Sequence, residues 1–265
     1  MTIDFHTHIF PDKIADKTIK YLSEKGGIPP FSNGSVSGLI QKAKEASVDL
    51  CVTLPVLTNP DSFESVNKFA EGINKSYPER IISFGAIHPR CENIDGKMLL
   101  LKNMGFKGVK IHPDYQGAYI NDEGYVKILQ SAKEYDLIVV THSGIDVAYP
   151  EDVHCTVKLL KELLSKVEHS KFVLAHMGCG GMYDEVLEYL CGEDLYFDTA
   201  FVLRSIGKEK FSRILERHGD DRILFASDSP WSDISNDLHI LRQYVDNDDS
   251  FEKIKYKNAK KLLDI

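Results

Sequence analysis

The stretch IDFHTHIF, residues 3–10, places two histidines at the end of a short apolar run. Side chains two residues apart in a strand point to the same side, so Asp4, His6 and His8 are expected to share one face. A doubly wound open sheet usually carries a glycine-rich turn after its first strand, and IDFHTHIFPDK contains no glycine. The stretch therefore favours a closed barrel, with two imidazoles able to converge on one metal ion.

Seven further apolar runs follow, and longer amphipathic segments lie between them. In TVKLLKELLSKVE (156–168), the apolar residues fall on one helical stripe. Strands that alternate with helices predict a parallel sheet, and eight such units predict an α/β (β/α)8 TIM barrel formed by one domain, residues 1–265. The alternative is a doubly wound open sheet. The eight runs are TIDF (2–5), VDLCVTL (48–54), RIISFGAI (80–87), FKGVKI (106–111), LIVVT (137–141), KFVLA (171–175), DLYFDT (194–199) and RILFAS (222–227).

The long connection after the first run includes GGIPPFSNGS (26–35), which is rich in Gly, Pro, Ser and Asn. Such a loop could either close over the mouth of the barrel or form a plain surface connection. At the other end of the chain, the basic cluster KIKYKNAKK (253–261) is typical of the solvated face of a last helix, with Ile254, Leu262 and Leu263 on its other side.

Composition restricts the functional classes. The net charge of −8 does not favour nucleic-acid binding, which usually needs a positive field. The sequence has no 18-residue apolar run and no secretory signal at its start. The five cysteines are odd in number and form no Cys-x-x-Cys, which is typical of reduced thiols. We expect a cytoplasmic protein with a small-molecule substrate, no nucleic-acid or membrane partner, and a homodimer as the assembly to test.

Six of the ten histidines fall at the ends of predicted strands, and catalytic groups of such barrels sit at those ends. One histidine at a strand end is usually structural, but six on one rim are hard to explain in that way. Asp228, in FASDSPW (225–231), adds a carboxylate where the last strand ends. The six histidines are His6, His8, His88, His112, His142 and His176.

Neutral imidazole is a good ligand for zinc and similar divalent metals. A third nitrogen from His142 and an oxygen from Asp228 would complete a site that begins with His6 and His8. We also expect Asp4 to orient a ligand imidazole through a hydrogen bond.

Five motifs along the whole chain, IDFHTHIF, GVKIHPDYQG, THSG, LAHMGCGG and RILFASDSPW, together resemble the amidohydrolase superfamily. The resemblance is closest to the amidohydrolase-related group that includes aminocarboxymuconate-semialdehyde decarboxylase. It implies a metal-dependent barrel with a catalytic histidine at His176 and a divalent ion, zinc first and manganese or iron as alternatives. The sequence departs from the group's pattern in the glycine-rich loop after His176. The implied metal ligands are His6, His8, His142 and Asp228.

In some members of the superfamily, a lysine at the position of Lys110 is carbamylated and bridges two metal ions. We expect one ion here, and two if Lys110 is carbamylated. For Lys110 we rank a contact to the substrate, or a contact that supports a ligand, ahead of a bridge between metals. Capping of the strand end is an equally good interpretation. Arg90 is the first candidate for a substrate carboxylate, because its fork suits one, and Arg204 is the second. The predicted substrate-binding residues are Lys110, His112, His88, Arg90 and Trp231.

The first functional hypothesis is a metal-dependent hydrolase that attacks an ester, lactone or amide with metal-activated water. In that scheme Asp228 accepts the proton of the water, and His176 stabilises the oxyanion or protonates the leaving group. The alternative is non-oxidative decarboxylation of an unsaturated or aromatic carboxylate, for which the same residues serve. Lys110 and FASDSPW argue against two phosphoesterase families that also begin with Asp-x-His-x-His, and the complete ligand set argues against a barrel without activity.

Overall fold

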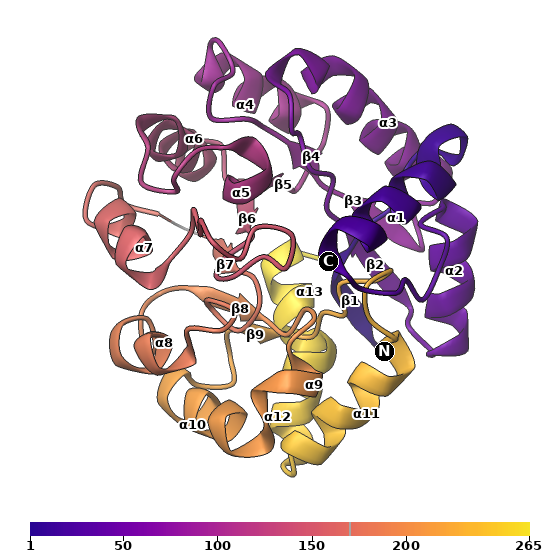
Figure 1. Cartoon of the computed structure of the whole chain (residues 1–265), viewed down its shortest axis with the longest axis vertical. Coiled ribbons are helices and arrows are strands. Elements are labelled where there is room, and N and C mark those ends of the chain that lie inside the picture. The colour runs from indigo at the N-terminus through magenta and orange to yellow at the C-terminus, as the bar shows by residue number, and fades with distance from the viewer. Residues whose placement is uncertain (170) are drawn as a thin grey trace.

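The computed structural model describes residues 1–169 and 171–265 as a ring of parallel strands surrounded by helices (Figure 1). Each predicted run forms a strand, but RIISFGAI is divided into β3 and β4 at Phe84. This residue still belongs to the barrel, because its backbone N–H donates to the carbonyl of Thr53 at 2.9 Å. The strands are β1 (Ile3–Thr7), β2 (Leu50–Thr53), β3 (Ile81–Ser83), β4 (Gly85–Ala86), β5 (Gly108–Ile111), β6 (Ile138–Thr141), β7 (Phe172–Leu174), β8 (Tyr196–Asp198) and β9 (Ile223–Leu224).

The strands form two parallel sheets, β1-β2-β3 and β4 through β9, each in chain order. The first and last strands are joined by backbone hydrogen bonds from Phe5 N to Phe225 O at 2.9 Å and from Asp228 N to His6 O at 2.8 Å. These bonds close the ring. The predicted (β/α)8 barrel is therefore confirmed, and the doubly wound alternative is wrong.

The helices follow the strands as the amphipathic segments predict, with short extra turns at the rim. They are α1 (Asp12–Gly26), α2 (Val36–Glu45), η1 (Pro60–Ser62), α3 (Phe63–Ser76), α4 (Ile94–Asn103), α5 (Pro113–Gln116), α6 (Glu123–Glu134), α7 (Val157–Leu164), α8 (Tyr183–Tyr189), α9 (Leu203–Ile206), α10 (Lys208–His218), α11 (Ile234–Tyr244), α12 (Asp248–Glu252), η2 (Lys253–Lys257) and α13 (Asn258–Leu263). No helix within residues 1–169 and 171–265 is both long and apolar enough to cross a membrane. All five cysteines are free thiols.

Loop 26–35 lies at the mouth of the barrel. The backbone N–H of Phe31 donates to the carbonyl of Pro230 at 2.7 Å, and Pro230 follows the end of the last strand. The preceding helix, α1, buries only Ala15 and Ile19. The loop joins α1 to α2, and the bond from Phe31 holds it beside the C-terminal rim.

The interior of the barrel is apolar below the mouth. Ile3 and Phe5 of β1 pack with side chains from β2, β6, β7 and the last strand. The other end is closed by α13, which contributes buried Leu262 and Leu263 and lies near the centre of the ring in Figure 1. The histidines and Asp228 predicted for the site lie at the opposite end, where the strands end.

Candidate metal centre at the barrel mouth

The residues predicted for the rim lie where their strands end. His6 is within β1, and each of the others follows its strand by one to four residues. Most are buried, so their side chains point into the protein and are not free in solvent. They are His6, His8, His88, His112, His142, His176 and Asp228.

An irregularity in β1 decides which of its side chains reach the site. Three steps from Asp4 to Thr7 are matched by only two steps along β2, so β1 contains one extra residue. The simple alternation expected from the sequence is therefore broken, and Asp4 does not orient an imidazole. Its carboxylate accepts hydrogen bonds from Ser227 N at 2.9 Å and Ser227 Oγ at 2.5 Å. Burial raises the pKa of Asp4 to about 7.

His6, His8 and Asp228 form a compact cluster, which we call the first group. The Nε2 atoms of the two histidines are 3.2 Å apart, and Asp228 Oδ1 lies 3.0 Å from His8 Nε2 and 3.5 Å from His6 Nε2. Ligand atoms around a tetrahedral ion with bonds of about 2.0–2.1 Å are separated by roughly 3.3–3.4 Å. The first group therefore has the spacing that one such ion needs.

The hydrogen bonds of the other ring nitrogens decide which atoms face this point. His6 Nδ1 donates to Asp198 Oδ2 at 2.8 Å, and His8 Nδ1 donates to the carbonyl of Leu54 at 2.9 Å. Each neutral ring then presents a bare Nε2 lone pair toward the other and toward Asp228. Three acceptors that converge in this way need a donor or a cation. Lys110 Nζ serves His6 Nε2 at 3.1 Å, and the spacing of all three ligand atoms also fits a divalent ion.

Lys110 lies beside the first group. Its Nζ is 3.1 Å from His6 Nε2, and its side chain is buried. Burial lowers the pKa of Lys110 to about 8 and, with the charge of Lys110, lowers the pKa of His6 to about 4. His6 is therefore neutral at pH 7, as a metal ligand must be. Carbamylation of Lys110, and with it a second ion, stays a prediction.

The structure places His142 outside the first group. Its Nδ1 is 2.9 Å from His176 Nε2, and its ring is stacked on His112 with centroids 4.2 Å apart. With His112 and Asp146 it forms another cluster, which we call the second group. The four ligands expected from the sequence are thus not arranged around one point, because the ring of His142 turns toward these neighbours.

His176 and Asp228 both have backbone conformations in the left-handed region, with φ of 61° and 67°. Residues other than glycine rarely adopt this conformation, and it is concentrated at functional sites. His176 Nδ1 donates to the carbonyl of Ala200 at 2.9 Å, which fixes its ring.

Three other candidates for substrate binding, His88, Arg90 and Arg204, already have partners. His88 Nδ1 accepts from Arg90 N at 3.0 Å, and the Arg90 guanidinium donates to the carbonyl of Gly117. Arg204 donates to Ser232 Oγ at 2.7 Å and to the carbonyl of Trp231. Neither arginine is held ready for a substrate carboxylate in this arrangement.

Sequence reasoning missed two acidic residues. Asp198 is the last residue of β8 and is fully buried, and Asp146 lies in the loop after β6. Asp198 Oδ2 holds His6, while its Oδ1 accepts from His176 N at 2.9 Å. The signal for Asp198 was available, because it ends its strand in DLYFDT just as Asp228 follows RILFAS.

Asp198→Asn should weaken metal binding about 10–100-fold, the effect usual for the hydrogen-bond partner of a ligand histidine. The amide oxygen can keep the bond from His176 N, so the amide nitrogen then faces His6 Nδ1 and drives the ring proton onto Nε2. Competition with a chromophoric chelator measures the affinity. An unchanged dissociation constant would show that Asp198 does not set the tautomer of His6.

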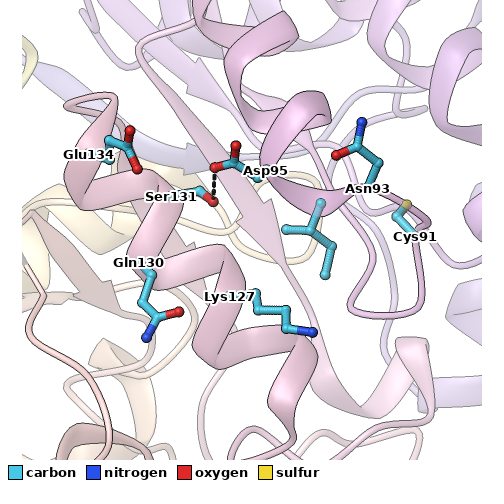
Figure 2. Close-up of a pocket in the computed structure, with 8 residues that line it drawn as sticks. Cys91, Asn93, Asp95, Lys127, Gln130, Ser131 and Glu134 are labelled. Atoms are coloured by element: carbon cyan, nitrogen blue, oxygen red, sulfur yellow. Dashed lines mark hydrogen bonds between the residues drawn. The ribbon is translucent and has the colours of Figure 1, made fainter.

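One surface cavity lies away from the mouth. Figure 2 shows it between α4 and α6, where Asp95 accepts a hydrogen bond from Ser131 at 2.8 Å. It has a volume of about 420 Å³ and contains none of the rim histidines. The concentration of histidine and carboxylate groups is therefore the better guide to the functional site.

Comparison with known proteins agrees with this geometry. A family model described as amidohydrolase matches residues 3–265. The chain belongs to the amidohydrolase family. No curated protein matches this amidohydrolase.

Solved structures resemble this amidohydrolase over nearly its whole length. A TIM-barrel protein from Bordetella bronchiseptica has 15% identity and a TM-score of 0.79, with 99% of this chain and 98% of that chain covered. A 2,6-dihydroxybenzoate decarboxylase from Rhizobium has 15% identity, a TM-score of 0.75 and the same coverage. A dihydroxybenzoic acid decarboxylase from Polaromonas, solved with manganese and 2-nitroresorcinol, has 14% identity, a TM-score of 0.74 and coverage of 99% and 96%. At identities this low, the structural likeness establishes a common fold and nothing more.

Proposed function

We propose that this amidohydrolase is a metal-dependent decarboxylase, which releases carbon dioxide from an aromatic or unsaturated carboxylate without oxidation. The observation that carries the proposal is the first group, whose spacing and lone pairs fit one divalent ion at the barrel mouth. The likeness to two decarboxylases over nearly their whole length supports this reaction over hydrolysis, which the sequence had placed first.

His6, His8 and Asp228 would hold the ion, with Asp198 and the Leu54 carbonyl keeping the two rings in the ligand tautomer. A bound divalent ion supplies Lewis acidity toward the oxygen atoms of the substrate. Zinc is our first candidate for a site with two imidazoles, and the manganese in the Polaromonas enzyme supports manganese as the second.

His176 and Lys110 would supply a proton and stabilise negative charge during the reaction. The bond from the substrate carbon to its carboxylate breaks, its electron pair stays on the carbon, and carbon dioxide leaves. His176 would deliver the proton that forms the new carbon–hydrogen bond, because its ring lies 5.7 Å from that of His6, centroid to centroid. Lys110 would stabilise the negative charge that develops nearby.

A substrate screen on metal-loaded protein tests the proposal. Hydroxybenzoates and unsaturated dicarboxylates are incubated with zinc- or manganese-loaded enzyme while carbon dioxide is measured by infrared absorption. Lactones and amides are tested in parallel in a pH-stat, with chelated protein as the control. We expect metal-dependent carbon dioxide release from at least one acid. Hydrolysis of a lactone or amide, with no carbon dioxide from any acid, would restore the hydrolase hypothesis.

A further inference from the structure

The carboxyl group of Asp4 is buried near the first group without belonging to it. Its neighbours in β1, Ile3 and Phe5, face the apolar interior of the barrel, so the side chain of Asp4 points outward, toward the layer of helices. The residue has no exposed surface. A buried carboxyl group is costly unless hydrogen bonds replace its water, so the partners of Asp4 show what it holds.

Asp4 accepts hydrogen bonds from both sides of the seam that closes the barrel. Its Oδ1 accepts from Ser227 N at 2.9 Å and from His6 N at 3.3 Å, and its Oδ2 accepts from Ser227 Oγ at 2.5 Å. These bonds join β1 to the segment that follows the last strand. One side chain thus connects the backbone of His6 to the residue that precedes Asp228.

Ser227 extends this connection across Asp228. Its Oγ also accepts from Ser229 N at 3.0 Å, so the residues on both sides of Asp228 are linked through one hydroxyl group. Asp228 has a φ of 67°, which is uncommon for residues other than glycine, and its N–H donates to the carbonyl of His6 at 2.8 Å. Asp4 and Ser227 therefore hold the turn from which the side chain of Asp228 reaches the first group.

The position of this turn determines how Asp228 meets the two imidazoles. Its Oδ1 lies 3.0 Å from His8 Nε2 and 3.5 Å from His6 Nε2, and a shift of the backbone at residue 228 would change both distances. Partners that orient the ligands of a metal usually change its affinity about 10–100-fold when they are removed. Asp4 orients its ligand through the backbone, so we expect an effect at the lower end of this range.

We propose that Asp4 is a positioning residue, which sets the affinity and the geometry of the metal site by holding the turn at Asp228. The inference rests on the proposed function for the ion itself. It gives a role in metal binding to a carboxyl group whose hydrogen bonds go to the backbone and to Ser227. A group that only stabilised the seam of the barrel would affect the free energy of unfolding and leave the ion unchanged.

Titration with cobalt after removal of the resident metal by a chelator, followed by visible absorption, tests this role. The spectrum of bound cobalt depends on the number and arrangement of its ligands, so it reports geometry as well as affinity. Asp4→Ala should bind cobalt about tenfold more weakly than the wild type and give an altered spectrum. Asp4→Asn keeps an acceptor oxygen for the N–H groups of Ser227 and His6, so it should recover most of the affinity.

Ser227→Ala tests the same connection from its other end. The change removes the hydroxyl group that donates to Asp4 and accepts from Ser229 N, and it adds no volume. This variant should also bind cobalt more weakly than the wild type. Because the bond that Asp4→Asn alters is then already absent, Asp4→Asn should cause no further loss of affinity in the Ser227→Ala background.

Asn258→Ala is the matched control for stability. Asn258 is buried, and its Nδ2 donates to the carbonyls of Asp220 at 2.6 Å and Ile223 at 2.8 Å. Ile223 begins β9, the strand that leads to Asp228 at its other end. The control should lower the Tm, as Asp4→Ala does, but keep the cobalt affinity and spectrum of the wild type.

Wild-type cobalt affinity and spectrum in Asp4→Ala or in Ser227→Ala would overturn the assignment. An equal loss of cobalt affinity in Asn258→Ala would also overturn it, because the effect would then follow stability. Failure of the decarboxylase proposal is distinguishable, because the test compares binding constants. These can be measured in a protein that releases no carbon dioxide.

Discussion

The Asp228→Asn variant should bind no metal, and its kcat/KM should fall about a thousandfold. Asp228 supplies the only carboxylate of the first group, 3.0 Å from His8 Nε2 and 3.5 Å from His6 Nε2. The contribution of a bound metal to transition-state stabilisation is several kcal/mol, and about 4 kcal/mol corresponds to this factor. Asparagine tolerates the left-handed backbone of residue 228, so the fold should be preserved.

Elemental analysis of freshly purified protein and initial rates of carbon dioxide release measure both effects. His239→Asn is the matched control, since His239 is exposed and its ring lies 3.0 Å from Gln243 of the same helix. This variant should keep wild-type metal content and rate. A fully metal-loaded Asp228→Asn protein would show that the ion binds elsewhere.

His176→Asn should lower kcat by roughly 10²–10⁴-fold and leave metal content unchanged. His176 is assigned to proton delivery and not to the first group, and its ring is fixed by bonds to Ala200 and His142. Residue 176 also has a left-handed backbone, which asparagine tolerates, so this substitution should again preserve the fold.

The comparison of kcat with KM separates proton delivery from substrate binding. Loss of a proton donor lowers kcat with little change in KM, whereas loss of a binding contact raises KM. If His176→Asn loses metal as Asp228→Asn does, His176 acts as a ligand and the proton donor must be sought among the other rim groups.

The fold followed from the sequence because its signals are local. Eight apolar runs separated by amphipathic segments each formed a strand, and the absence of a glycine-rich turn in IDFHTHIFPDK agreed with a closed ring. The division of the third run at Phe84 is a detail of hydrogen bonding between strands, which a single run does not encode.

The sequence predicted which residues lie at the site better than it predicted how their side chains are arranged. Strand ends identified the rim histidines and Asp228, but the extra residue in β1 turned Asp4 toward Ser227. The imidazole partner is Asp198, which is distant in sequence from His6. Whether His142 faces the first group or the second depends on its side-chain torsions, which neither spacing nor periodicity determines.

The central claim is that the ion at the first group serves decarboxylation, and the fate of the proton tests it most directly. Metal-loaded enzyme is incubated in D2O with an acid on which it acts, and the product is examined by mass spectrometry and NMR. We expect one deuterium at the carbon that carried the carboxylate and one equivalent of carbon dioxide. A product that gains the elements of water, with no new carbon–deuterium bond, would contradict the account.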